Sequence, residues 1–296
     1  MRAHPDTKPA VLTQGAAETD DRFAPDFFII GAMKAGTTTL YRYLQQYEDV
    51  GMSRIKETDF FVAEKNFDLG DTWYKSQFDL NRPLLGEASP NYTKHDVFPG
   101  VPARIARAAP NARFIFLARD PVDRFVSQYR HSWLHGHMRA QPQGLLTSDT
   151  GRHMIECSRY GVQIAQYLTQ FDRAQFLFLD FDVLCTRPQD TLNQVAGFLD
   201  LPHRSITHEA PANTAAHTAH VPGIVKRAAR SKLARRFDYL IPRSTHEIVR
   251  RAFAIRKSPP VPLLDQNLRS KIADLLRKDA QRFRMISGLE CPQWCV

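Results

Sequence analysis

The segment Asp26-Phe-Phe-Ile-Ile-Gly-Ala-Met-Lys-Ala-Gly-Thr-Thr-Thr-Leu40 decides the fold of this 296-residue chain. Its apolar run ends at Gly31, a loop carrying Lys34 and Gly36 follows, and three threonines then open a helical pattern. This order predicts a strand, a glycine-bounded loop and a helix N-terminus. Backbone N–H groups and the helix dipole both favour an anion at such a place. The segment therefore predicts a phosphate-binding loop.

The two glycines keep the Gly-x4-Gly spacing of a Walker A loop, but the residues that follow them differ. Thr37 and Thr38 stand where a Lys-Ser/Thr pair is expected, and the lysine has moved into the loop as Lys34. An ATPase or a kinase needs that lysine and a magnesium-binding hydroxyl at fixed positions. The loop therefore indicates a phosphate-containing ligand that is handled by different chemistry.

A second segment, Arg113-Phe-Ile-Phe-Leu-Ala-Arg-Asp-Pro-Val-Asp-Arg-Phe-Val-Ser-Gln-Tyr129, places Arg119 at a strand end and Ser127 on the next helix. The Lys-x-Gly-Thr-Thr-Thr loop and this segment resemble the 5′-phosphosulfate and 3′-phosphate segments of sulfotransferases. That family uses 3′-phosphoadenosine 5′-phosphosulfate (PAPS) as sulfuryl donor. The resemblance covers about residues 26–200 and is closest to the heparan-sulfate-type and bacterial members.

The resemblance implies a P-loop-like parallel β-sheet flanked by helices, and a set of residues that bind the donor. Lys34 would stabilise the negative charge that grows on the leaving phosphate during in-line displacement. The remaining donor-binding positions that the family implies are Ala35, Gly36, Thr37, Thr38, Thr39, Arg119, Ser127 and Tyr160, with Lys226 and Arg227 in a late loop.

A third segment, Arg54-Ile-Lys-Glu-Thr-Asp-Phe-Phe61, resembles the family's Glu-x-x-Phe-Phe sequence, and Glu57 falls on the glutamate that serves as general base. A partly desolvated carboxylate can accept the proton of an attacking hydroxyl. The plain alternative is a solvated glutamate beside Lys56. Cytosolic members use a histidine instead, which leaves His95 and His131 as further candidates.

A fourth segment, Gly86-Glu-Ala-Ser-Pro-Asn-Tyr92, resembles the family's Glu-Lys-Ser/Thr-x-x-Tyr sequence but departs from it. The lysine that assists the leaving group in heparan-sulfate-type enzymes falls on Ala88, so this contact is absent. Either Lys34 acts alone or another cation, such as Lys56, takes the place of the missing lysine. We expect four residues to line the acceptor cleft, with a plain turn at Pro90 as the alternative: Lys56, Glu87, Ser89 and Tyr92.

Composition supports one α/β domain over residues 26–296, preceded by a disordered leader over residues 1–25. The chain is 43% hydrophobic, which suffices for a full core. No apolar stretch reaches the roughly 18–20 residues of a membrane span, and no secretory signal is visible. We therefore expect a cytoplasmic protein. The four cysteines lack the spacing of a zinc site, so no metal is expected and unpaired thiols are favoured.

Alternating apolar runs and amphipathic segments predict parallel strands joined by helices. Buried strands are expected over 27–30, 113–118 and 175–180. Helices are expected over 37–47, 121–130 or beyond, 160–171, 188–199 and 266–283, and loops over 140–151 and 203–222.

The net charge of +9 is concentrated in one segment. Residues 224–257 carry eleven Lys and Arg against two acids, whereas the remaining chain holds 29 of each sign. A local basic patch indicates an anionic partner, such as an acidic acceptor or an anionic membrane surface. Nucleic acid is not the expected partner, and the oligomeric state is undetermined by the sequence.

The sequence therefore predicts a PAPS-dependent sulfotransferase that modifies a hydroxyl, or less favourably an amine. A carbohydrate, a lipid-linked glycan and a secondary metabolite all remain open as the acceptor. An ATP-using P-loop kinase is the first alternative, disfavoured by the missing Gly-Lys-Ser/Thr. A basic non-catalytic nucleic-acid-binding protein is the second, and strongly salt-dependent binding to random DNA would identify it.

Overall fold

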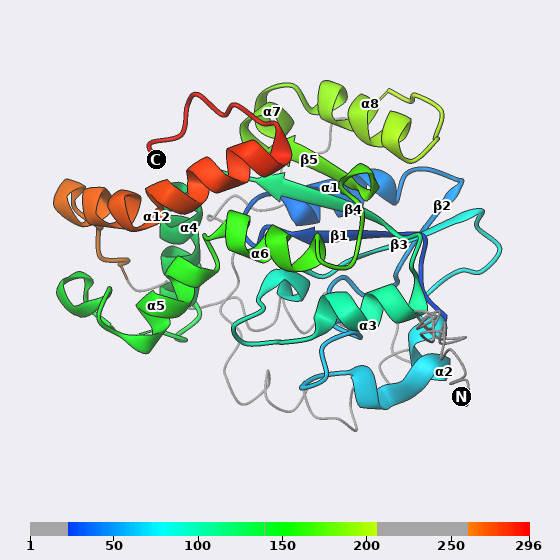
Figure 1. The fold of residues 1–296 in the computed structure, drawn as a ribbon, viewed down its shortest axis with the longest axis horizontal. Coiled ribbons are helices and arrows are strands. Elements are labelled where there is room, and N and C mark those ends of the chain that lie inside the picture. Colours follow the sequence, from blue (N-terminus) through cyan, green and yellow to red (C-terminus); the bar gives the residue numbers. More distant parts are fainter. Residues whose placement is uncertain (1–22, 139, 206–259) are drawn as a thin grey trace, which may run out of the picture.

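Five parallel strands form one sheet in the order β2-β3-β1-β4-β5 (Figure 1). The computed structural model describes residues 23–138, 140–205 and 260–296. Its strands are β1 Phe27–Gly31, β2 Val50–Met52, β3 Leu84–Ala88, β4 Arg113–Ala118 and β5 Phe176–Asp180. The predicted parallel α/β sheet is confirmed.

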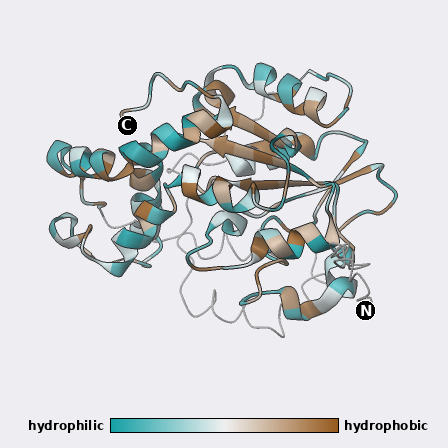
Figure 2. Ribbon diagram, in the orientation of Figure 1, coloured by the Kyte–Doolittle hydropathy of each residue, from teal (hydrophilic) through white to brown (hydrophobic). Residues whose placement is uncertain are grey.

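Helices cover both faces of the sheet, with α3 and α6 in front of it and α1 behind it in Figure 1. This double cover explains why the strands are hydrophobic along their length while the helices are mixed (Figure 2). The α-helices of the described residues are α1 Thr37–Leu44, α2 Gly70–Lys75, α3 Val101–Ala108, α4 Pro121–Leu134, α5 Asp149–Glu156, α6 Tyr160–Tyr167, α7 Phe181–Thr186, α8 Pro188–Phe198 and α12 Gln266–Ser287.

The direction of the chain connections reverses around β1. The chain leaves β1 for β2 on one side, and it later passes from β3 over β1 to β4 on the other side. Such a reversal opens a crevice at the carboxyl ends of the strands. Gly31 ends β1 there, and a Cβ at this position would lie 2.4 Å from the ring of Phe116, so only glycine fits.

The predicted start of the helix after β4 is confirmed. The carboxylate of Asp120 accepts hydrogen bonds from the N–H groups of Val122 and Asp123, both at 2.9 Å, and Pro121 occupies the first helical position. An aspartate cap followed by proline satisfies donors that have no intrahelical acceptor. The helix extends to Leu134, in agreement with the prediction that it runs through Arg130 or beyond.

Short elements are where the sequence prediction was incomplete. The helix predicted for 37–47 ends at Leu44, and the predicted loop 140–151 contains the start of α5. The three-residue strand β2 and the glycine-containing β3 were also missed. Elements of three to eight residues repeat the hydrophobic pattern too few times to reveal it.

The last helix, α12, holds α6 by its N-terminus. Asp279 accepts hydrogen bonds from the N–H groups of Gly161 and Val162, each at 2.9 Å.

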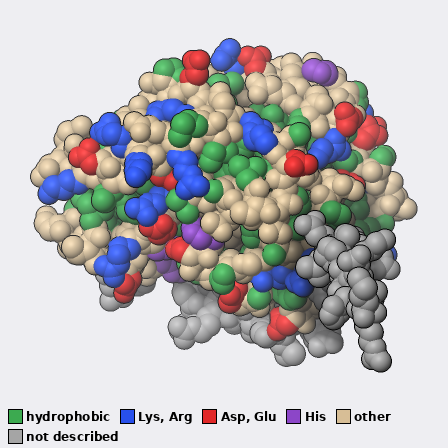
Figure 3. All heavy atoms as spheres, in the orientation of Figure 1, with side chains coloured by type: hydrophobic (Ala, Val, Ile, Leu, Met, Phe, Trp, Pro, Cys, Tyr) green, Lys and Arg blue, Asp and Glu red, His purple; other side chains and the backbone are tan. Residues whose placement is uncertain are grey.

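On the face drawn in Figure 3, Lys and Arg side chains gather at the left, over α12, which carries six basic and two acidic residues. No helix of the described part combines the length and apolarity needed to cross a membrane. All four cysteines are free thiols.

The packed chain begins before the predicted domain boundary at residue 26. Phe23 and Ala24 pack against the core, and the ring of Phe23 lies 5.3 Å from that of Phe78. A depression of about 470 Å³, lined by Phe23, Thr72 and Leu80 among others, lies at this amino end of β1. It contains no predicted site residue, so the crevice at the opposite strand ends is the candidate site.

Four predicted features lie outside the described residues. They are the leader up to residue 22, the donor-binding positions Lys226 and Arg227, the basic segment 224–257, and the loop 203–222 beyond residue 205.

Candidate active site

The loop after β1 has the backbone geometry of an anion-binding turn. Lys34 and Gly36 both have left-handed backbones, with φ of 72° and 89°. Gly36 also precedes α1, where a Cβ would lie 2.9 Å from Cδ2 of Leu184 and 3.0 Å from Cδ2 of Phe181. Glycine is therefore required at this turn. The first turn of α1 holds no acidic residue, which leaves its positive end available to an anion.

The residues around this turn contribute mainly backbone groups. The amides of Thr37 and Thr38 open α1, where the first N–H groups of a helix have no intrahelical acceptor. Thr37 is buried, whereas Thr38 and Thr39 are partly exposed and can offer their hydroxyls. The side chain of Ala35 is in the core, so only its backbone faces a ligand.

Arg119 follows β4, which pairs with β1, so the fold brings it beside the loop. Its Nη1 lies 3.4 Å from the carbonyl oxygen of Lys34, and its guanidinium lies 4.8 Å from the ring centre of Phe181. Among the described residues Arg119 forms no ion pair with a carboxylate. Ser127 is partly exposed on α4, and the described part gives its hydroxyl no hydrogen-bond partner. Both groups are therefore available to a phosphate.

Glu57 and Lys34 lie close enough for their charges to interact. Burial lowers the pKa of Lys34 and the charge of Arg119 lowers it further, while the charge of Glu57 opposes both. Burial raises the pKa of Glu57, but the charge and hydrogen bond of Lys56 together with the charges of Lys94 and Lys65 outweigh it, and the net pKa is below the ordinary value. Glu57 is therefore ionised at neutral pH, and its side chain is 49% exposed.

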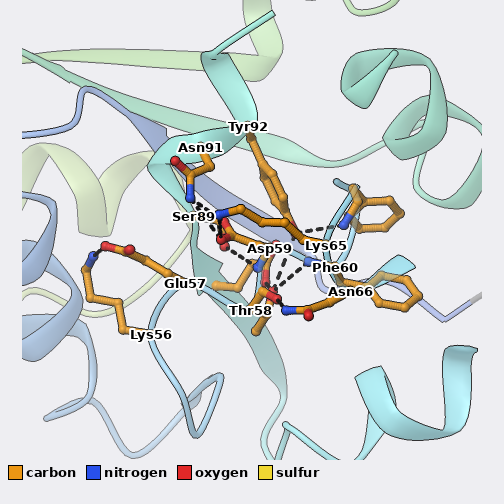
Figure 4. Close-up of polar contacts among 12 residues, drawn as sticks. Lys56, Glu57, Thr58, Asp59, Phe60, Lys65, Asn66, Ser89, Asn91 and Tyr92 are labelled. Atoms are coloured by element: carbon orange, nitrogen blue, oxygen red, sulfur yellow. Dashed lines mark hydrogen bonds and ion pairs between the residues drawn. The ribbon is translucent and has the colours of Figure 1, made fainter. Parts of the chain in front are cut away.

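The segment that carries Glu57 is tied to the end of β3. The N–H of Glu57 donates to the carbonyl oxygen of Ala88 at 3.0 Å, and that of Asp59 donates to the hydroxyl of Ser89 at 3.2 Å. Figure 4 shows Lys56 and Glu57 extending to one side of the segment, while Thr58 and Asp59 point to the other. The segment thus presents one carboxylate to the crevice and anchors itself with the next two side chains.

The comparisons with known proteins agree with this geometry. A family model described as the sulfotransferase domain matches residues 24–219. The chain belongs to the sulfotransferase domain family. It is 27% identical over 193 residues to bifunctional heparan sulfate N-deacetylase/N-sulfotransferase 1 of Caenorhabditis elegans, covering 60% of this chain and 22% of that protein. It is 28% identical over 210 residues to heparan sulfate glucosamine 3-O-sulfotransferase 3A1 of Mus musculus, covering 67% and 50%.

Among solved structures, a sulfotransferase from Alicyclobacillus acidocaldarius matches with a TM-score of 0.65 and 20% identity. The match covers 92% of this chain and 99% of that chain, and it shows a shared fold. This sulfotransferase-domain chain spans about a fifth to a half of the length of the two curated relatives described above.

The sulfotransferase fold gives Tyr160 a different position from the predicted donor contact. Its side chain is fully buried, and its hydroxyl donates to the carbonyl oxygen of Arg119 at 3.0 Å. Burial raises its pKa well above the ordinary value. Tyr160 therefore supports the backbone of Arg119 from within the core, and its buried ring and hydroxyl are not accessible to a ligand.

Three of the four residues predicted to line the acceptor cleft are instead buried. Glu87 and Ser89 are 0% exposed and Tyr92 is 1% exposed. Tyr92 accepts a hydrogen bond from the N–H of Phe61 at 3.2 Å, and Ser89 accepts one from Asp59. Because strand residues alternate between faces and both faces of this sheet are covered, a polar residue on β3 is buried on either side. These residues support the Glu57 segment.

The position of the missing family lysine is occupied by a buried alanine. Ala88 is 0% exposed, and Lys56 is paired with the carboxylate of Glu57, so Lys56 is already engaged. Lys94, which sequence reasoning missed, is partly buried, and its charge acts on Glu57. Burial lowers the pKa of Lys94, and the neighbouring charges of Lys65 and other cations add to that effect.

The remaining alternatives receive less support from the structure. His131 is exposed on α4, where its ring packs 4.1 Å from that of His135. His95 follows the 3-10 turn Pro90–Thr93 and is partly buried. Among the described residues, no group of three or more His, Cys, Asp or Glu side chains could hold a metal ion.

Proposed function

We propose that this protein transfers a sulfuryl group from PAPS to a hydroxyl, or less favourably an amine, of an acceptor. The observation that carries the proposal is that the charges of Lys34 and Glu57 act on one another at the carboxyl ends of the strands, while Arg119 lies beside Lys34 and forms no ion pair with a carboxylate in the described part. A cation for the leaving group and a base for the nucleophile are the two groups that in-line sulfuryl transfer requires.

Glu57 removes the proton from the acceptor hydroxyl as its oxygen attacks sulfur. The new oxygen–sulfur bond forms while the bond from sulfur to the bridging oxygen of the donor breaks, releasing adenosine 3′,5′-bisphosphate. Lys34 stabilises the charge that develops on the leaving phosphate, and this charge exists mainly in the transition state. The lowered pKa of Glu57 keeps it ionised, and therefore able to accept a proton, throughout the neutral range.

The donor is held at both of its phosphate groups in this proposal. The amides and hydroxyls that open α1, together with Lys34, bind the 5′-phosphosulfate. Arg119 and Ser127 bind the 3′-phosphate, for which a planar guanidinium is well suited. Two parallel strands, β1 and β4, position these groups, so the spacing between them is fixed by the sheet.

The names of the relatives support a glycan as acceptor. One is a heparan sulfate N-sulfotransferase and another is a heparan sulfate glucosamine 3-O-sulfotransferase, so hydroxyl and amine acceptors both occur among them. The basic segment 224–257 supports an acceptor that is anionic. Lipid-linked glycans and secondary metabolites remain alternatives, because alanine replaces the family lysine at Ala88.

Nucleotide binding tests the reaction class. Calorimetry should show tight binding of adenosine 3′,5′-bisphosphate and weak binding of ATP, with magnesium having little effect. Preferential, magnesium-dependent binding of ATP would support the kinase alternative instead. Dominant salt-dependent binding of random DNA would support a nucleic-acid-binding protein.

The substitution Glu57→Gln tests the base. It keeps the shape of the side chain but cannot accept a proton, so turnover should fall by about 10²–10⁴-fold. Affinity for adenosine 3′,5′-bisphosphate should hardly change. Glu64→Gln, the same substitution at a nearby exposed position, is the control. Near-normal turnover of Glu57→Gln under conditions where chemistry is rate-limiting would assign the base to another residue.

A further inference from the structure

The carboxyl group of Glu87 lies in the core and contacts Thr58, the residue that follows the candidate base Glu57. It is 0% exposed on β3, and its Oε2 accepts a hydrogen bond from the hydroxyl of Thr58. Its Oε1 and the hydroxyl of Tyr74 are both buried and form no hydrogen bond of good geometry in the described part, although the hydroxyls of Tyr74 and Tyr92 lie near enough to interact with the carboxyl. No cation forms an ion pair with Glu87 among these residues. A buried carboxyl without a cation is costly, and the role of Glu57 does not explain it.

The groups that face Glu87 come from four elements. Tyr74 belongs to α2, Tyr92 to the turn after β3, Tyr167 to α6, and Asp59 to the Glu57 segment. The three tyrosines are neutral, since burial raises the pKa of each well above its ordinary value. Asp59 is negative and paired with Lys65, so the one charge in this set opposes ionisation of Glu87.

Thr58 links Glu87 to the candidate base, because its hydroxyl is hydrogen-bonded to Glu87 and it directly follows Glu57 in the chain. Its neighbours Glu57 and Asp59 have left-handed backbones with φ of 67° and 48°, a conformation that ordinary residues rarely adopt. The carbonyl oxygen of Thr58 accepts from Nδ2 of Asn66 at 2.6 Å, and its hydroxyl donates to Glu87. The side chain of Thr58 therefore anchors the segment immediately after Glu57.

We propose that Glu87 is a positioning residue for Glu57, acting through the hydroxyl of Thr58, and that its neutral form holds the segment in the active arrangement. This inference rests on the proposed role of Glu57 as general base. In the neutral acid, Oε2 still accepts from Thr58 while a proton on Oε1 can be donated toward a tyrosine hydroxyl. In the ionised form the hydrogen bond from Thr58 persists, but a negative charge lies in the core with no cation paired to it in the described part, and it repels Asp59, which belongs to the same segment as Glu57.

The protonation of Glu87 then changes within the physiological pH range. Burial raises its pKa from 4.5 to about 7, hydrogen bonds from Thr58 and Tyr92 restrain the rise, and the charge of Asp59 adds to it. Glu57, with its lowered pKa, remains ionised over the same range. Loss of the Glu87 proton should therefore reduce the rate of the chemical step as the pH rises through about 7.

The experiment is a pH profile of the single-turnover rate from pH 5.5 to 9, with donor affinity measured in parallel. The wild type should show a decline above about pH 7. Glu87→Gln is permanently neutral, so it should keep the wild-type rate at pH 6 within a few-fold and lose this decline. Thr58→Val should lower the rate about tenfold at every pH, the equivalent of one hydrogen bond. Thr58→Ser, which keeps the hydroxyl, should restore most of the rate.

Two outcomes would overturn the inference: an unchanged decline in Glu87→Gln, or a normal rate in Thr58→Val. If Glu87→Gln does not fold, the comparison of Thr58→Ser with Thr58→Val still tests the positioning role. Glu57→Gln, measured in the same assay, tests the role of Glu57 as general base separately from the positioning role of Glu87. A normal rate in that variant would remove Glu57 as the base, whereas loss of its activity beside an unchanged Glu87→Gln profile would remove only the positioning role.

Discussion

The free energy of unfolding should depend on pH through Glu87. The pKa of this carboxyl is about 7 in the folded protein against an ordinary value of 4.5. At about 1.36 kcal/mol for each pKa unit, this gap corresponds to roughly 3 kcal/mol. The folded protein holds the proton more tightly, so the stabilisation is fully present below about pH 4.5 and is lost as the pH rises through about 7.

Glu87→Gln removes this titration without removing the hydrogen bond from Thr58, because the amide oxygen can accept it. From pH 5 to pH 8 the wild type should lose about 2–3 kcal/mol relative to the variant. Urea denaturation at four pH values measures the difference, and all other titrating groups cancel because both proteins contain them. Glu64→Gln, at an exposed site, should parallel the wild type. Parallel curves for Glu87→Gln and the wild type would refute a neutral, buried Glu87.

Three further predictions concern the donor site. Arg119→Ala should weaken binding of adenosine 3′,5′-bisphosphate in calorimetry by about 10–100-fold, the worth of a charge-assisted hydrogen bond; equal weakening for adenosine 5′-phosphosulfate, which lacks the 3′-phosphate, would contradict the assignment. Gly36→Ala should destabilise the protein by about 2 kcal/mol or more in denaturant titration, because φ is 89° and the Cβ would overlap Leu184; Gly197→Ala, where a Cβ meets nothing within 4 Å, should not. Asp120→Ala should lower stability by about 0.5–2 kcal/mol through loss of the α4 cap, and an unchanged thermal midpoint would argue against that cap.

The backbone features of the proposed donor site could be predicted from the sequence because each of them is local. The strand, the turn at Gly36 and the helix start lie within fifteen consecutive residues, and the cap at Asp120 lies next to Arg119. Local hydrogen bonding and backbone preferences determine these features, and they depend little on the rest of the chain. The placement of Arg119 beside Lys34 followed from a rule about strand ends in parallel sheets.

The supporting half of the site depends on contacts between distant residues. Sequence reasoning placed Glu87, Ser89, Tyr92 and Tyr160 in contact with ligands, but all four are buried. The hydroxyl of Thr58 meets Glu87 across 29 positions of the chain, and that of Tyr160 meets the backbone of Arg119 across 41. No local pattern encodes such pairs.

The sequence by itself therefore determined the strand-turn-helix after residue 26, the parallel sheet and the choice of candidate base, since short runs of residues encode each of them. Only the tertiary structure decided which polar residues face the crevice and which stand behind it. The physical reason is that helices cover both faces of the sheet, so a glutamate on β3 is buried whichever face it takes. Burial makes Glu87 a group that titrates near neutrality, whereas the charges of neighbouring lysines, Lys56 first among them, keep Glu57 ionised at the exposed edge.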